Sequence, residues 1–383
     1  MEKTTRTKTQ QESALPIQIK VIGVGGGGCN TVNDMMRTPV NGITYIAANT
    51  DIQSLDKNNA TQKIQLGHKG TGAGMVPEDG RKAAEESKTE IEEALSGTDL
   101  LFITSCFGGG TGTGATPLIA EIAHKKEILT IAIIATPFDY EIDRFDTAAE
   151  GIEQLRPYVD ALIVMSNAKL SQVLDPDISV NEALSASNDA LRNGISGIVS
   201  VLLNVGTMNV DFADIRTIMS FKGTALMGFG KAEGSNRAQK AIQQAISNPL
   251  LDNTDVSSAK GLIVYTLTAP NSLKMRERSE ISAFFNTFYS GKKETFTKFG
   301  FGEDERLAED EMQVVVIATG LQSNDNMPNI LTPVSGNISG NMERVFRSGR
   351  SARSANLTAA SFSDQAIIDA FDSPAIDHYR NEQ

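Results

Sequence analysis

Two clusters of glycine, residues 25–28 and 108–110, constrain the fold of this chain more than any other feature, because each follows a strand-like segment. The first segment, residues 17–24, is rich in β-branched residues, and the second is the apolar run at residues 100–104. Glycine lets a backbone turn sharply and come close to an anion. We therefore expect both clusters to lie in strand-to-helix turns where the main chain can meet a ligand.

Strand-like and helix-like segments alternate through the first half of the chain. We expect strands at residues 17–24, 43–48, 100–104, 128–135 and 161–165, and helices from Asn30, at 81–95, at 116–126 and near 146–155. Pro117 falls in the first turn of the third of these helices, where proline is tolerated. Such alternation predicts a parallel, doubly wound α/β sheet of the Rossmann-like kind.

One long helix is predicted next, at residues 179–203. Its apolar stripe, with spacings of seven, four, three and four, consists of Leu184, Leu191, Ile195, Ile198 and Leu202. Asn188 falls on the same stripe, and a polar side chain on a buried surface needs a partner. The simplest interpretation of Asn188 is an amide that bonds to nearby backbone.

The pattern resumes more loosely after this helix, with strands expected at residues 225–230, 261–268 and 312–319 and a helix at 237–247. We therefore divide the chain into five parts. These are a disordered segment at 1–16, a nucleotide-binding domain at 17–178, the central helix at 179–203, a smaller α/β domain at 204–320 and a flexible tail at 321–383.

The charge balance argues against a general nucleic-acid binder. Lys and Arg number 35 against 47 Asp and Glu, a net charge of −12, whereas phosphate backbones are bound by clustered cations. Nucleotide binding remains compatible if backbone N–H groups hold the phosphates. The two cysteines exclude a disulfide framework, and no run approaches the roughly 20 apolar residues of a membrane span. We expect a soluble cytosolic protein that does not insert into membranes.

The first glycine cluster has a second interpretation. Residues 23–28 match G-x-G-x-x-G after a strand, and Asp51 lies at the end of the next strand, where a dinucleotide-binding domain places its ribose-binding acid. An NAD-dependent oxidoreductase is therefore the first alternative function.

The second cluster belongs to a seven-residue loop of glycine and threonine, residues 108–114. Its glycines allow close approach to an anion, and Thr111 and Thr113 add hydroxyl donors. No lysine follows, so it is not a Walker A loop. Two phosphate-binding loops on separate strands suit a polyphosphate better than a single pyrophosphate bridge.

A pair of carboxylates forms the third candidate element. Asp211 and Asp214, with Asn209, precede an apolar helical run, and residues three apart share a helix face. They could cap that helix, or they could orient a water molecule or hold a cation for hydrolysis. The three histidines are scattered, which argues against a zinc site and leaves any metal ligands unknown. Glu141 and Arg144 could hold a ribose or form a surface ion pair.

Taken together, these motifs resemble the FtsZ family of bacterial cell-division GTPases, in the tubulin superfamily, over residues 17–321. The motifs that carry the resemblance lie at residues 25–30, 49–51, 72–74, 108–114, 209–214 and 247–251. The resemblance implies a GTP- or GDP-binding domain and a second α/β domain joined by the central helix. It also implies Mg²⁺ and head-to-tail assembly into a filament at the cytoplasmic division site.

The resemblance implies roles for individual residues. Residues 26–30 and 110–112 contact phosphates and ribose, Glu141 and Arg144 bind near the ribose, and Asn188 reads the guanine edge. Asp211 and Asp214, with Asn209, act in the site of the neighbouring subunit. The full nucleotide-binding set comprises Gly26, Gly27, Gly28, Cys29, Asn30, Asn49, Asp51, Ala73, Gly74, Gly108, Gly109, Gly110, Thr111, Gly112, Thr113, Gly114, Thr136, Pro137, Glu141, Arg144, Leu184 and Asn188.

Two departures from the family pattern leave further questions. The loop at residues 67–71 is about three residues shorter than is usual, which makes a filament scaffold with little turnover a second alternative. Residues 371–380 are a degenerate form of the tail peptide through which family members bind membrane-tethering and cell-division proteins.

Overall fold

The computed structural model describes residues 17–203, 211–221, 224–246, 259–289, 295–305 and 307–321. Asn209, the motif at 247–251, the segment at 1–16 and the tail from residue 322 lie outside the described residues.

A parallel sheet forms the larger domain, in the strand order β3-β2-β1-β4-β5-β6. Its strands are β1 (Ile19–Val24), β2 (Ile43–Asn49), β3 (Gln62–Gln65), β4 (Leu100–Cys106), β5 (Leu129–Thr136) and β6 (Ala161–Ser166). The central strands β4 and β5 are almost wholly buried, as expected for parallel strands covered on both faces. The predicted doubly wound architecture is confirmed.

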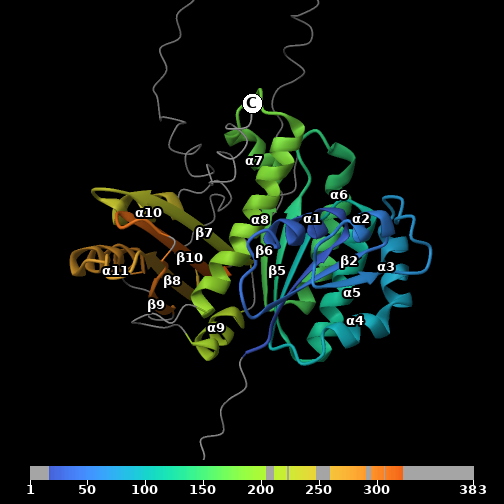
Figure 1. Ribbon diagram of the computed structural model, residues 1–383, viewed down its shortest axis with the longest axis horizontal. Helices are drawn as coiled ribbons and strands as arrows, with labels where there is room; N and C mark the ends of the chain where they lie inside the picture. Colours follow the sequence, from blue (N-terminus) through green and yellow to red (C-terminus); the bar gives the residue numbers. More distant parts are fainter. Residues whose placement is uncertain are drawn as a thin grey trace, which may run out of the picture.

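Helices cover both faces of this sheet (Figure 1). Their bounds are α1 (Gly25–Met35), α2 (Ile52–Asp56), α3 (Pro77–Glu86), α4 (Lys88–Ala94), α5 (Gly110–Lys125), α6 (Phe145–Leu155) and α7 (Asn167–Val173), with short 3-10 turns η1 (Ile142–Arg144) and η2 (Arg156–Tyr158). Helix α1 and the central helix α8 (Val180–Leu203) share one core, and α3, α4, α5 and α6 share the core on the opposite face.

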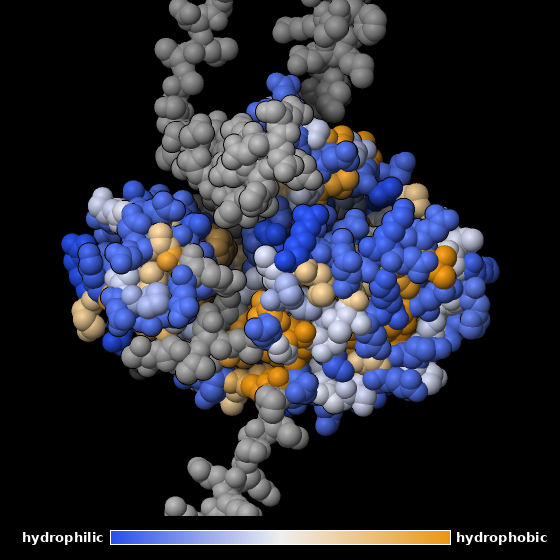
Figure 2. All heavy atoms as spheres, in the orientation of Figure 1, coloured by the Kyte–Doolittle hydropathy of each residue, from blue (hydrophilic) through white to orange (hydrophobic). Residues whose placement is uncertain are grey.

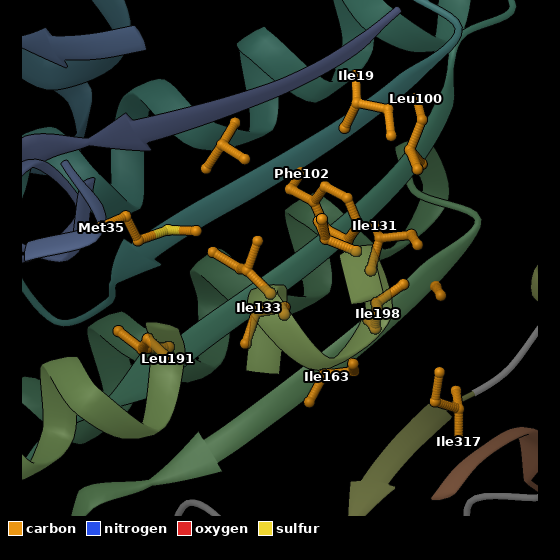
Figure 3. Packing of buried hydrophobic residues seen from close by; sticks show 14 of the residues in the cluster. Ile19, Met35, Leu100, Phe102, Ile131, Ile133, Ile163, Leu191, Ile198 and Ile317 are labelled. Atoms are coloured by element: carbon orange, nitrogen blue, oxygen red, sulfur yellow. The ribbon is translucent and has the colours of Figure 1, made fainter. Parts of the chain in front are cut away.

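The central helix α8 joins the two domains. Leu191, Ile195 and Ile198 are fully buried and pack toward β5 and β6, together with Ile317 of the smaller domain (Figure 3). The predicted apolar stripe is therefore a domain-joining surface for most of its length. Leu184 departs from it, because its side chain remains 45% exposed.

The smaller domain continues the sheet in the order β7-β10-β8-β9 and joins β6 through one pair, Leu162 with Thr224. Its elements are α9 (Phe212–Met219), β7 (Thr224–Glu233), α10 (Arg237–Ile246), β8 (Gly261–Thr268), α11 (Met275–Tyr289), β9 (Phe296–Glu303) and β10 (Glu311–Leu321). Strand β10 is antiparallel to both neighbours, and α10 and α11 pack on the opposite face from α9. Strand β10 ends at Leu321, one residue beyond the predicted domain.

Three predicted helix boundaries were wrong. Helix α1 begins at Gly25 and not at Asn30, and α5 begins at Gly110 and not at residue 116, so the glycine clusters themselves form first turns. Pro117 consequently lies inside α5 and not in its first turn. The predicted helix at 81–95 is two helices, because it breaks at Ser87, whose hydroxyl bonds to the loop after β3.

The face shown in Figure 2 is mostly hydrophilic, with an apolar area below its centre. None of the helices within the described ranges combines the length and apolar character needed to cross a bilayer.

We expect Ile198→Ala to lower the free energy of unfolding by about 2–5 kcal/mol, because it removes buried methyl groups from the surface between α8 and the sheet. Val180→Ala is the control on the same helix; its side chain is 61% exposed, so a change within about 0.5 kcal/mol is expected. Guanidinium unfolding followed by circular dichroism measures both. Equal effects of the two substitutions would contradict the packing described here.

Candidate functional site

A cavity of about 410 Å³ opens at the carboxyl ends of the parallel strands. Its walls come from the turns after β1, β4, β5 and β6 and from the N-terminal half of α8. The lining residues are Gly26, Gly27, Asn30, Cys106, Phe107, Gly109, Gly110, Thr111, Gly112, Thr136, Pro137, Phe138, Glu141, Arg144, Asn167, Leu184, Ser187 and Asn188. Both predicted glycine loops therefore contribute to one cavity.

The N-termini of α1 and α5 meet at this cavity. Gly25 has a positive φ of 71°, and a Cβ at Gly25 would lie 2.8 Å from the Gly112 nitrogen. A Cβ at Gly27 would lie 2.3 Å from the Cys106 sulfur. A side chain at Gly25 would push α1 and α5 apart, and one at Gly27 would push α1 away from the end of β4. Glycine is what allows these close approaches.

Neither helix has a side-chain cap. The residues that precede them, Val24 and Gly109, have no side-chain oxygen that could accept a hydrogen bond from the first-turn N–H groups. Orphan N–H groups and the positive ends of two helix dipoles therefore face the same space, which suits a negatively charged ligand. This arrangement could bind an anion without lysine.

The hydroxyl groups of the second loop have separate roles. The Thr111 and Thr50 hydroxyls lie 2.6 Å apart, and Thr111 also lines the cavity. The Thr113 hydroxyl instead accepts the Gly108 N–H at 2.9 Å, and Thr113 is buried. Thr113 therefore closes the turn, whereas Thr111 is placed to meet a ligand.

Glu141 and Arg144 form an ion pair in the lining of the cavity. The guanidinium of Arg144 donates to Glu141 Oε1 at 2.5 Å, while Glu141 Oε2 accepts the Phe138 N–H at 3.0 Å. The arginine side chain is 40% exposed and the glutamate 22%. The ion pair thus fixes a carboxylate at the cavity wall, where hydroxyl groups of a ligand could reach it.

Amide side chains from α8 and from the turn after β6 also line the cavity. Ser187 donates to Asn167 Oδ1 at 2.7 Å, and Thr31 donates to Asn188 Oδ1 at 3.5 Å. Asn188 therefore has a side-chain partner and lines the cavity, as does Leu184. Sequence reasoning missed Asn167 and Ser187, whose proximity depends on how α8 packs beside β6.

Nine of the predicted nucleotide-binding residues lie outside the lining, namely Gly28, Cys29, Asn49, Asp51, Ala73, Gly74, Gly108, Thr113 and Gly114. Several of them pack against, or form hydrogen bonds with, the segments that form the cavity wall. A Cβ at Gly28 would lie 2.3 Å from the Thr104 oxygen, and the Cys29 thiol bonds to main-chain oxygens of Gly23 and Ala48. The Ala73 side chain lies against Gly110, so this loop packs on the start of α5.

Asp51 has a local role that competes with dinucleotide binding. Its carboxylate caps α2, accepting the Gln53 and Ser54 N–H groups and the Ser54 hydroxyl. The hydroxyl bond, and then the backbone bonds, hold the pKa of Asp51 below its usual value. Since this acid does not line the cavity, the ribose-binding role required by the NAD interpretation has no support.

The predicted carboxylate pair forms a capping box at the start of α9. Asp211 Oδ1 accepts the Asp214 N–H at 2.7 Å, and Asp214 Oδ2 accepts the Asp211 N–H at 3.3 Å. Lys298 of β9 also contacts Asp214 Oδ2, at 2.5 Å. Neither aspartate lines the cavity. Helix α9 lies beyond the C-terminal end of α8, whereas the cavity uses residues near its N-terminal end (Figure 1).

The described residues offer few side-chain ligands for a metal ion. Across the described parts of the chain, no group of three or more His, Cys, Asp or Glu side chains converges. A divalent ion here would take most of its ligands from a bound phosphate and water, which is usual for Mg²⁺. Thr111 is the cavity residue whose hydroxyl could join them.

Comparison with known proteins agrees with this geometry. The Tubulin/FtsZ family, GTPase domain, matches residues 18–175, and the FtsZ family, C-terminal domain, matches residues 223–322. The chain is 45% identical over 377 residues to the cell division protein FtsZ of Neisseria meningitidis, covering 95% of this chain and 96% of that protein. It is 41% identical to that of Azotobacter vinelandii, covering 93% and 95%.

Solved structures show the same architecture. An empty FtsZ dimer from M. jannaschii superimposes with a TM-score of 0.75 at 35% identity, covering 81% of this chain and 90% of that one. CetZ2 from Haloferax volcanii, a GTPγS-bound protofilament, gives a TM-score of 0.68 at 18% identity, covering 86% and 100%. The second likeness concerns the fold alone.

The thiol of Cys106 in the cavity wall is expected to resist alkylation. Desolvation, and then the negative charge of Glu141, raises its pKa to about 12, so the thiol stays protonated at neutral pH. At pH 8.5 its thiolate fraction is about a thousandfold below that of an ordinary cysteine. Iodoacetamide labelling and peptide mapping should show slow modification whose rate rises about tenfold per pH unit, with no levelling off near pH 8.5 as for an ordinary cysteine. Rapid labelling of folded protein at pH 8 would contradict this.

Proposed function

The chain belongs to the FtsZ family of tubulin-like GTPases, and from that membership we propose how its residues bind and hydrolyse GTP. It is a GTPase of cell division that assembles into filaments. The proposal concerns the roles of single residues, the point at which the active site becomes complete, the metal ion and the partners.

The polyphosphate of GTP binds where α1 and α5 converge. Main-chain N–H groups of residues 26–28 and 109–112 meet its oxygens, and the two helix dipoles offset its charge. The Glu141 carboxylate, fixed by Arg144, accepts hydrogen bonds from the ribose. This binding mode explains how an acidic chain without a Walker lysine holds a triphosphate.

The guanine base lies beside the amide side chains that line the cavity. Asn188 reads its edge, Asn167 lies beside it through the bond to Ser187, and Leu184 covers part of the ring. Asn167 enters this proposal from its position in the structure. Leu184 provides apolar contact without an aromatic ring to stack on the base.

One observation carries the proposed mechanism: the cavity and the carboxylate pair lie toward opposite ends of one rigid helix. Fifteen residues of α8 separate Asn188 from Leu203, about 22 Å of helix, and Asp211 lies farther along the chain. Asp211 and Asp214 therefore act in another subunit's cavity, in a head-to-tail contact that propagates into a filament.

In that shared site the carboxylates of one subunit orient and polarise a water molecule against the γ-phosphate held by the next. The water oxygen bonds to phosphorus as the bond to the β-phosphate oxygen breaks, and GDP and phosphate are the products. A Mg²⁺ ion would supply charge neutralisation there, and Thr111 is a cavity hydroxyl that could help to hold it. Asn209 joins the pair in this proposal, although it lies outside the described residues.

Partners and location follow from family membership alone. We place the protein in the cytoplasm at the division site. Residues 371–380, which lie outside the described residues, are the candidate segment for membrane-tethering and other division proteins.

A titration tests the shared site directly. Total GTP turnover should be negligible below a threshold protein concentration and should rise linearly with concentration above it, because the site is complete only in the filament. Phosphate release and sedimentation, measured across one concentration series, should show the same threshold. Turnover per subunit that is independent of concentration would contradict the shared site, and no turnover at any concentration would favour the scaffold.

Substitution separates binding from hydrolysis. Asp211→Ala and Asp214→Ala should bind GTP within about twofold of the parent, since neither side chain lines the cavity. Their turnover should fall by at least about a hundredfold. Both remove a carboxylate from the α9 cap and are expected to lower stability by about 1 kcal/mol, so thermal unfolding is measured alongside. Hydrolysis at the parent rate in either variant would remove that aspartate from the mechanism.

A further inference from the structure

Lys298 forms an ion pair with one member of the carboxylate pair, Asp214. Its Nζ lies 2.5 Å from Asp214 Oδ2, and it reaches there from β9, the edge strand of the smaller domain. The contact joins residues that are far apart in the sequence and on different elements, which lie at the same end of the domain (Figure 1).

The contact fixes the orientation of Asp214. Its Oδ2 receives both the Lys298 ammonium and the Asp211 N–H, so rotation of the carboxylate would break two bonds at once. Oδ1 is then the oxygen that remains for a water molecule. The lysine side chain is 34% exposed and the aspartate 16%. An ion pair this open contributes little to folding stability, so stability alone does not account for it.

Charge gives the contact a second consequence. Bringing two carboxylates to a triphosphate places like charges together, and repulsion grows as water leaves the interface. A lysine paired with one carboxylate offsets one negative charge, while the oxygens of that carboxylate still accept hydrogen bonds. The phosphate cavity itself has only Arg144 as a cationic lining residue, and Arg144 is paired with Glu141.

We propose that Lys298 is a positioning residue for GTP hydrolysis: it holds Asp214 in the orientation needed in the neighbouring subunit's site and offsets its charge there. This inference rests on the proposed role of Asp214. It predicts an effect on kcat, exerted through Asp214, with nucleotide binding and filament assembly retained.

The test compares Lys298→Met with Lys298→Arg. Lys298→Met should lower kcat about tenfold or more, with KM, GTP binding and the assembly threshold within about twofold of the parent. Lys298→Arg keeps the positive charge and should recover most of the activity. Lys231→Met is the matched control, because Lys231 pairs with Glu311 at 3.0 Å with 36% and 8% exposure, toward the other end of the same sheet. Its kcat should equal that of the parent.

A double variant shows whether Lys298 acts through Asp214. In Asp214→Ala protein, the added Lys298→Met should cause no further loss of turnover, because the side chain that it positions is gone. A multiplicative further loss would mean that Lys298 acts independently and would overturn the proposal.

The remaining outcomes are also distinct. Parent-like kcat in Lys298→Met, with Asp214→Ala inactive, overturns this inference and leaves the shared site intact. Parent-like turnover in Asp214→Ala overturns the proposed function itself. Loss of assembly in folded Lys298→Met, or failure of Lys298→Arg to recover activity while it assembles, would assign Lys298 another role and overturn the proposal.

Discussion

The close approach of two helix N-termini to one point is the constraint on which the rest of this structure depends. Helices α1 and α5 can meet there because Gly25 carries no side chain, and both helices start close to the end of β4 because Gly27 and Gly112 carry none. Their uncapped N–H groups are suited to an anion that the chain's net charge of −12 would otherwise repel. Main-chain dipoles replace the lysine of other phosphate-binding loops, so binding depends on backbone geometry more than on side-chain charge.

The cavity lies near the N-terminal end of α8, and α9 follows the C-terminal end of the same helix. The length of α8 therefore separates the cavity from the carboxylates of α9. A helix buried along Leu191, Ile195 and Ile198 is rigid, and it keeps the carboxylates of α9 away from the cavity of the same subunit. If Asp211 and Asp214 act in the next subunit, as proposed, this separation couples turnover to assembly, and packing of the core takes part in the control of catalysis.

The sequence predicted the alternating sheet and both glycine loops because these depend on local pattern. It placed the starts of α1 and α5 too late, since glycine is a weak helix former on its own and only tertiary packing holds residues 25–28 and 110–114 in helices. Helix α11 and strand β9 were missed because each is partly exposed and shows little periodicity. Asn167 and Lys298 could not be found, because their partners are distant in sequence.

The capping and catalytic interpretations of Asp211 and Asp214 are compatible. Each carboxylate uses one oxygen in the capping box, which fixes both side chains relative to the helix start. The positive end of α9 and the Lys298 ammonium then lower the energetic cost of bringing two negative groups toward a polyphosphate. A capping box is well suited to this task because it holds two carboxylates in a fixed relation without burying them. In the proposed shared site, the start of α9 in one subunit completes the cavity of the next.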